Sequence, residues 1–252
     1  PDRAFDARAM AVHAAMIDRL DQGLAKVFDA LRETGAWDNT LIVFLADNGA
    51  SPEEPQHFLP GFDRPSHTRD GRAIRYTTRK QPMPGPQTTY AGIGPMWANA
   101  ANTPFRYWKK EQYEGGVATP FIAHWPAGIG AAGGKLSAEP AHVVDIMATA
   151  LDLAGVAPSK PIEGRSLVPV LRGGGRDGHE AIYFEHFRAR GLRRANWKLV
   201  ALENRPWELY DLAQDRTETR NLAEDRPELV SEMAAMWERW AERAKVYPAP
   251  PN

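Results

Sequence analysis

An unbroken apolar run that ends in a carboxylate constrains the fold of this chain more than any other feature. Residues 41–45, Leu-Ile-Val-Phe-Leu, are followed after one alanine by Asp47, Asn48 and Gly49. Consecutive large apolar residues suit a strand covered on both faces, as in a parallel sheet, better than a half-exposed strand. Ligands of open α/β sheets bind just beyond the carboxyl ends of such strands. We therefore expect a buried strand that carries Asp47 and Asn48 to a functional site, although Asp-Asn-Gly is also ordinary turn composition.

The residues around this run predict two αβ units. Apolar residues recur at steps of three and four over residues 6–34, which is typical of an amphipathic helix, and Gly35 ends the pattern. A helix, a short turn and an apolar strand in this order imply a parallel sheet. A second apolar run at residues 119–126 and a helical pattern at 141–154, ended by Gly155, complete the second unit.

Residues 51–104 form a long basic segment without periodicity, interrupted by many prolines and glycines. Structureless connections longer than about 12–15 residues are uncommon in compact domains and are usually functional lids or disordered segments. We expect a Pro/Gly-rich loop whose basic residues meet an anionic substrate, with Arg72 and Arg75 as candidate substrate-binding residues. A solvated basic loop without such a role is the alternative.

A glycine triplet at residues 173–175 is the best candidate for a linker. Residues 1–172 would then form an α/β domain, and residues 176–246 a small unit of antiparallel strands packed on a helix that starts at Pro227. Its predicted strands cover residues 181–185, 197–201 and 207–210. Residues 247–252 would be a fraying tail.

The composition excludes several classes of protein. With 31 Lys and Arg against 32 Asp and Glu, the formal charge of −1 gives no general attraction to nucleic acid or membranes. No apolar run approaches the roughly 18 residues of a membrane span. The absence of cysteine excludes disulfides, thiolate metal sites and a cysteine nucleophile within these residues. None of this indicates a compartment.

Five segments, in this order along the chain, resemble the C-terminal portion of a type I sulfatase, from the arylsulfatase branch of the alkaline phosphatase superfamily. Each motif is weak alone, and their order makes the resemblance specific. The segments are Val12–Asp21, Leu45–Ala50, Lys109–Pro120 with its Glu-Gly-Gly, Asp145–Gly155, and Trp207–Asp215 followed by Asn221-Leu-Ala.

The resemblance implies a fold and a set of roles. It implies part of an alkaline-phosphatase-like parallel or mixed sheet with flanking helices, followed by the small C-terminal antiparallel sheet. Asp47 and Asn48 would bind one calcium ion, and Lys109 would contact the sulfate of a small sulfate ester, with Lys110 as the neighbouring alternative. The nucleophile of the family is a formylglycine, made from the first residue of a Cys/Ser-x-Pro-x-Arg motif.

That motif is absent from these residues. There is no cysteine, and the nearest serine segment, Ser159-Lys-Pro-Ile-Glu163, has glutamate where arginine is required. We therefore expect a fragment that lacks roughly the first half of its catalytic domain. Such a fragment would be inactive alone, would bind calcium at millimolar affinity or weaker, because calcium takes about 6–8 ligands, and would expose a large apolar patch.

Two other functions stay open. A phosphatase or phosphonate hydrolase of the same superfamily often has Asp-His-Gly after the equivalent strand, which suits zinc or manganese, whereas the oxygen of Asn48 favours calcium. A non-catalytic pseudo-enzyme or binding module would explain the missing nucleophile.

Overall fold

The computed structural model of the protein describes residues 3–54, 65–77 and 81–246, and it has the mixed α/β class that the sequence predicts. None of the helices in these ranges is both long and apolar enough to cross a membrane. The elements are α1 (Arg3–Glu33), η1 (Trp37–Asn39), β1 (Ile42–Leu45), β2 (Arg75–Tyr76), β3 (Thr89–Tyr90), α2 (Gly94–Ala101), α3 (Glu114–Val117), β4 (Phe121–His124), α4 (Pro126–Ile129), η3 (Gly130–Ala132), α5 (Asp145–Ala154), α6 (Val168–Leu171), β5 (Ile182–His186), β6 (Ala189–Arg194), β7 (Trp197–Ala201), β8 (Glu208–Asp211) and α7 (Pro227–Arg243).

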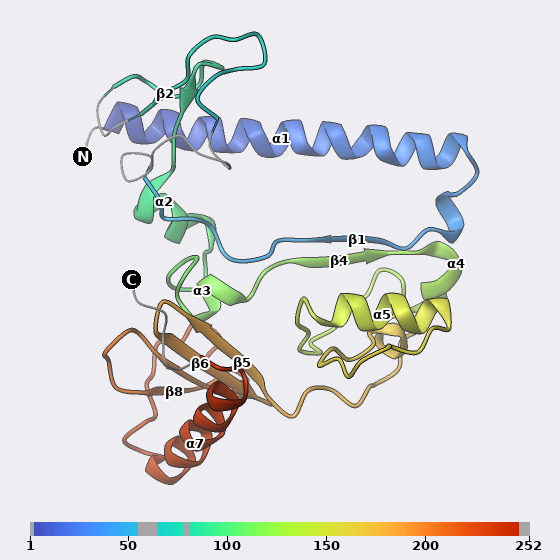
Figure 1. The fold of residues 1–252 in the computed structure, drawn as a ribbon, viewed down its shortest axis with the longest axis vertical. Coiled ribbons are helices and arrows are strands. Elements are labelled where there is room, and N and C mark those ends of the chain that lie inside the picture. The colour runs from blue at the N-terminus through green and yellow to red at the C-terminus, as the bar shows by residue number, and fades with distance from the viewer. Residues whose placement is uncertain (1–2, 55–64, 78–80, 247–252) are drawn as a thin grey trace.

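Helix α1 forms where the 3.6-residue pattern predicts it, but its apolar stripe is uncovered. Within α1 only Ala9 is buried, whereas Ile17, Leu20 and Val27 are each more than half exposed. In Figure 1 the helix runs alongside the β1–β4 pair and is joined to it at one end through η1. An amphipathic helix is stabilised mainly by burying its apolar face. The apolar stripe of α1 is therefore an exposed surface against which further polypeptide can pack.

Strand β1 pairs with β4, and the pairing is antiparallel. The apolar run 41–45 predicts a strand buried on both faces in a parallel sheet, and for the β1–β4 pair that prediction is wrong. No third strand pairs with β1 or β4 in the described part of the chain, and Phe44, Phe121 and Ile122 are all substantially exposed. The order of helix and strand along a chain fixes where a strand begins, whereas its partner is chosen by contacts distant in sequence.

The segment 51–104 contains more structure than predicted. Stretches 55–64 and 78–80 lie outside the described residues, but β2 and β3 form a short parallel pair, and α2 is a regular helix. Pro95 lies in the first turn of α2, where its missing N–H costs nothing. The indole Nε1 of Trp97 donates to the carbonyl of Asp6, 2.9 Å away, which ties α2 to α1. A contact this distant in sequence gives no local signal.

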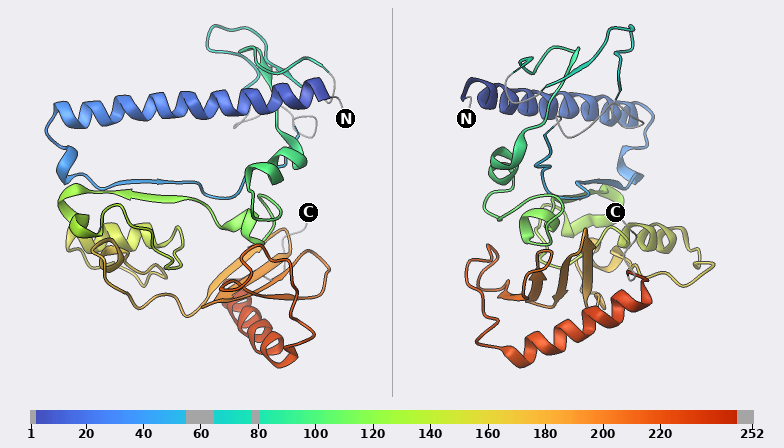
Figure 2. Two further views of the ribbon diagram at one scale, coloured as in Figure 1. Left: turned by 180° about the vertical axis from the view of Figure 1, so that it is seen from behind. Right: turned by 60° about the vertical axis from the view of Figure 1, so that its left-hand side comes forward.

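The C-terminal residues form a four-stranded antiparallel sheet in the order β5-β6-β7-β8, with α7 on one face. Figure 2 shows α7 lying along the sheet and α3 approaching from the other side. The predicted antiparallel strands and the helix beginning at Pro227 are confirmed, but β6 was not foreseen. The core between the sheet and α7 consists of Leu192, Leu199, Leu209, Met233, Met236, Trp237 and Ala241. The boundary at residues 173–175 stays a prediction, and the tail 247–252 lies outside the described residues.

Candidate functional site

A cavity of about 810 Å³ brings together the three residues on which the sequence analysis focused. Asp47, Asn48 and Lys109 all line it. Asp47 is exposed, and Asn48 and Lys109 are partly buried. The remaining walls come from the turn around α3, the N-terminal end of α5 and the edge of the C-terminal sheet. The end of β1 therefore opens onto a space bounded by parts of the chain that are far apart in sequence.

Close backbone contact holds the segment after β1 against α3. Gly49 N donates to Gly116 O at 2.9 Å, and Lys109 N donates to Ala50 O at 3.0 Å. A Cβ atom on Gly49 would lie 1.8 Å from the carbonyl oxygen of Gly115. Real Cβ atoms do not approach so closely, so glycine is required by space at this position. The Asp-Asn-Gly segment and the Glu-Gly-Gly turn thus form one packed unit.

Asn102 joins the same unit from the end of α2. Its side-chain Oδ1 accepts from Ala50 N at 3.0 Å, and its Nδ2 donates to the carbonyl of Tyr107 at 2.9 Å. These two bonds satisfy backbone groups on both loops that flank the cavity. Asn102 therefore fixes the spacing between the segment that carries Asp47 and the segment that carries Lys109.

Two adjacent lysines share one carboxylate beside the cavity. Glu53 lies 3.6 Å from Lys109 Nζ and 3.5 Å from Lys110 Nζ. Burial alone would raise the pKa of Glu53, but the charge of Lys109, the hydroxyl of Ser51 and the charge of Lys110 hold that pKa below its ordinary value. One carboxylate cannot neutralise two ammonium groups. The cavity edge therefore keeps a net positive charge at the lysines.

A buried ionic cluster anchors the turn of α3 to the C-terminal sheet. Lys198 Nζ of β7 lies 2.8 Å from Glu114 Oε1 and 3.0 Å from Glu218 Oε1, and all three side chains are almost fully buried. Glu218 Oε2 also accepts from Glu114 N at 2.7 Å. Burial alone would raise the pKa of Glu114, but Lys198 and neighbouring arginines hold it below its ordinary value. For Glu218, burial and the repulsion from Glu114 outweigh the attraction of Lys198, so its pKa is raised.

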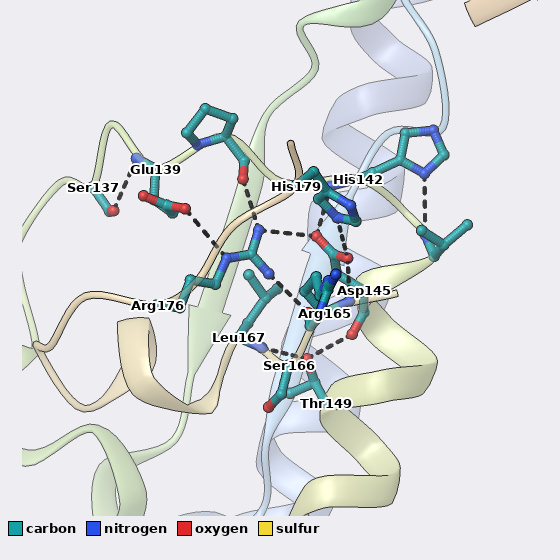
Figure 3. Close-up of polar contacts among 12 residues, drawn as sticks. Ser137, Glu139, His142, Asp145, Thr149, Arg165, Ser166, Leu167, Arg176 and His179 are labelled. Carbon is teal, nitrogen blue, oxygen red and sulfur yellow. Dashed lines mark hydrogen bonds and ion pairs between the residues drawn. The ribbon is translucent and has the colours of Figure 1, made fainter. Parts of the chain in front are cut away.

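A third buried carboxylate, Asp145 at the start of α5, holds the segment that carries His142, and Figure 3 shows its polar contacts. Its oxygens accept from Arg176 Nη2 at 3.1 Å and from the backbone N of His142 at 3.0 Å, and one contacts His179 Nε2 at 2.7 Å. Burial alone would raise the pKa of Asp145, but these bonds and one from Arg165 N hold it below its ordinary value. The residue His142, which lines the cavity, is thereby fixed to α5.

The predicted substrate-binding arginines lie elsewhere. Neither Arg72 nor Arg75 is among the cavity-lining residues of the described chain. Arg72 pairs with Asp70 at 2.8 Å and donates to the side chain of Gln87, and Arg75 is the first residue of β2. The structure therefore brings Asp47, Asn48 and Lys109 together without these two arginines, whose proposed role in specificity stays a prediction.

The donor set of the cavity fits part of a calcium shell. Asp47 and Asn48 offer oxygen donors, the type that calcium takes in proteins. Among the residues that the structure describes, no group of three or more His, Asp and Glu could hold a metal ion. The fit is therefore that of two donors in a shell of about 6–8.

Several charged residues around the site are not expected from the sequence, among them Glu53, Arg176, Arg193, Lys198, Arg216 and Glu218. Lys198 gave a usable signal, because a lysine within the apolar strand Trp197-Lys-Leu-Val-Ala requires a buried counter-charge if the strand is covered. Glu53, Arg193 and Arg216 lie in charged segments where nothing local separates them from a solvated surface.

Two protein-family models match the chain. The model described as Sulfatase matches residues 1–156, and the model described as N-sulphoglucosamine sulphohydrolase, C-terminal, matches residues 105–245. An arylsulfatase from Klebsiella aerogenes is 32% identical over 174 residues, which are 66% of this chain and 34% of that protein. An uncharacterized sulfatase from Schizosaccharomyces pombe is 32% identical over 211 residues, 79% of this chain and 36% of that protein.

Solved structures share the fold. A protein in complex with its substrate D-glucosamine-2-N,6-O-disulfate superposes with a TM-score of 0.61 at 22% identity, over 92% of this chain and 40% of its own. A phosphonate monoester hydrolase of Agrobacterium radiobacter superposes with a TM-score of 0.56 at 21% identity, over 91% and 40%. The chain thus spans about a third of the length of the curated relatives and two fifths of these structures.

Proposed function

Because this chain belongs to the sulfatase family, we propose that it forms part of an enzyme that hydrolyses sulfuric esters, to which it contributes two calcium ligands and a sulfate-binding lysine. The observation that carries the proposal is that Asp47, Asn48 and Lys109 line one cavity although residues 47 and 109 lie far apart in sequence. The formylglycine nucleophile and the remaining calcium ligands would come from sequence outside these 252 residues, as the missing motif suggests.

Each residue of this chain would have a distinct task. The ammonium group of Lys109 would neutralise charge on the sulfate oxygens, where the negative charge of a transferring sulfuryl group is spread. Asp47 and Asn48 would hold the calcium ion, which when bound would stabilise the same oxygens as a Lewis acid. Glu53 would orient the lysines in the absence of substrate, since it lies within 3.6 Å of Lys109 and 3.5 Å of Lys110.

Replacement of each lysine in turn by alanine, within the complete polypeptide that carries these residues, tests the proposal. Lys109→Ala should lower kcat/KM for 4-nitrophenyl sulfate by about 100-fold or more, the usual cost of removing one group that stabilises a transition-state oxyanion. Lys110→Ala is the matched control, because it also lines the cavity and pairs with Glu53. Lys110→Ala should lower kcat/KM by less than about 10-fold if Lys110 does not contact the sulfate oxygens. Equal losses in both variants would contradict the assignment of Lys109.

The metal and the reaction class need separate measurements. Calorimetry should find millimolar or weaker calcium binding by the 252-residue chain, lost in Asp47→Ala, because two donors fill a small part of the shell. Micromolar binding would contradict a site shared with other sequence. If the complete polypeptide hydrolysed phenylphosphonate esters but not sulfate esters, the phosphonate hydrolase alternative would replace the sulfatase, and activity on neither class would favour a non-catalytic module.

A further inference from the structure

Arg193 of β6 is a cation of the cavity that has no task in the function proposed above. Its neighbour Leu192 points into the core against α7, and alternation along the strand sends Arg193 to the other face. There it stands directly across from Lys198 of β7, and Glu114 and Glu218 hold Lys198. Like charges at directly opposed positions repel each other. The two carboxylates relieve this repulsion at Lys198 rather than at Arg193.

The guanidinium of Arg193 lacks a carboxylate partner. Within the described residues no carboxylate lies at ion-pair distance from it, and its Nε donates to the carbonyl of Ala195, 3.2 Å away, in the turn that follows β6. Burial, helped by the charge of Arg216, lowers the pKa of Arg193 despite the attraction of Glu114 and Glu139. Arginine nevertheless keeps its proton in proteins. A partly buried charge of this kind is stabilised by an anion.

A second arginine and the carboxylates that line the cavity also indicate an excess of positive charge beside Arg193. Arg216 follows β8, lines the cavity, and lies 3.3 Å from Glu114, whose other oxygen is taken by Lys198. Of the carboxylates that line the cavity, Glu139 pairs with Arg176 at 3.3 Å, Asp47 is the proposed calcium ligand, and burial raises the pKa of Glu111. The C-terminal sheet thus presents cationic groups to the cavity beyond those that the sulfate requires.

We propose that Arg193, assisted by Arg216, binds a second anionic group carried by the alcohol that is released from the sulfate ester. This inference rests on the proposed function and names its substrate class: esters whose leaving group itself bears a carboxylate or another sulfate. The planar fork of a guanidinium matches both oxyanions through two parallel hydrogen bonds. A cavity of about 810 Å³ has room for a ligand much larger than the sulfate alone.

Two sulfate esters of the same shape test the inference in the complete polypeptide: 4-carboxyphenyl sulfate and the neutral 4-carbamoylphenyl sulfate. The native protein should prefer the carboxylate ester, and Arg193→Gln should lower kcat/KM for that ester by about 10-fold or more, mainly through KM, as for loss of a hydrogen bond to a charged group. The amide ester should change little, and Arg193→Lys should restore part of the preference. Arg194→Gln is the control, because Arg194 pairs with Glu232 of α7, 2.6 Å away.

The outcomes distinguish failure of the anion site at Arg193 from failure of the sulfatase proposal. Equal losses on both esters in Arg193→Gln, or a native protein without preference for the carboxylate, would overturn the role of Arg193 and leave the sulfatase proposal standing. If neither ester is hydrolysed, the sulfatase proposal fails. In that case, calorimetry with benzene-1,4-disulfonate and benzenesulfonate tests the anion site. If the native protein binds the disulfonate more tightly and Arg193→Gln abolishes this difference, the anion site is supported. Equal affinities for the two compounds in the native protein would overturn it.

Discussion

Replacement of Lys198 by methionine should destabilise this protein more than its single lost charge suggests. Methionine keeps most of the length and volume of the lysine side chain, so the packing of β7 changes little. The ammonium group, however, lies 2.8 Å from Glu114 and 3.0 Å from Glu218 in a region where all three side chains are nearly inaccessible to water. In Lys198→Met these two carboxylates stay buried without their common counter-charge.

Removal of one partner from a buried ion pair costs about 3–5 kcal/mol. Glu114 keeps Arg216 at 3.3 Å and Glu218 keeps the backbone N–H of Glu114, so we expect the lower end, about 3 kcal/mol at pH 7. The pKa of Glu218 is already raised in the native protein, and loss of Lys198 should raise it further. An acid whose folded-state pKa is raised destabilises the fold at high pH, and this penalty falls as the pH drops toward its unfolded value of about 4.3.

Urea unfolding followed by tryptophan fluorescence measures the effect, because Trp197, Trp207, Trp237 and Trp240 all lie in the C-terminal sheet and α7 or beside them. The loss should shrink between pH 7 and pH 5, and the double variant Lys198→Met/Glu218→Gln should recover part of it. Arg220→Met removes an exposed ion pair as a control and should change stability by less than about 1 kcal/mol. A loss below about 1 kcal/mol in Lys198→Met, or one independent of pH, would refute the reasoning.

Three further results are expected. Gly49→Ala should lower the free energy of unfolding by about 1–3 kcal/mol, because the new Cβ would overpack against the carbonyl of Gly115. Gly23→Ala, at an open position within α1, should raise the free energy of unfolding by about 0.5–1 kcal/mol. Equal urea midpoints for the two variants would contradict this. Asp145→Asn should lower stability at neutral pH and flatten its acid dependence, because a depressed pKa stabilises the fold above the unfolded value of about 3.9 and the effect fades as pH falls through the folded pKa; an unchanged acid-unfolding curve would argue against the network. The 252-residue chain should self-associate through its exposed apolar faces, and Ile17→Lys should reduce the association seen by sedimentation velocity; a monodisperse native chain would contradict it.

Local patterns in the sequence predict the three longest helices, α1, α5 and α7, and several strands, but not α2 or the short helices. The periodicity of α1, the proline that begins α7 and the glycine at position 155 after α5 each act through nearby backbone, so they can be read from neighbouring residues. Strand β6 escaped prediction because four arginines and a glycine in Arg188–Arg194 hide the alternation between Leu192 in the core and Arg193 in the cavity. The antiparallel pairing of β1 with β4 depends on contacts that no local pattern encodes.

The candidate site was found by resemblance more than by spacing. Asp47 and Asn48 follow an apolar strand and could be suspected directly, but Lys109 is one of many surface lysines until the Glu-Gly-Gly turn beside it is recognised. The reason for that turn appears only in three dimensions, where Gly49 leaves room for the carbonyl of Gly115, Gly115 leaves room for the carbonyl of Arg106, and Glu114 reaches Lys198, 84 residues away. Electrostatic partners at such separations are chosen by the fold and leave no periodic trace.

The ion pair between Glu114 and Lys198 makes the position of Lys109 depend on residues that are translated much later. Lys109 leaves the ribosome long before the strand that fastens its loop, so the proposed sulfate-binding lysine takes its fixed position only after the C-terminal sheet has been translated and folded. A premature stop codon in β6 or β7 would therefore spare the codons of Asp47, Asn48 and Lys109 and still produce a protein whose lysine has no fixed position.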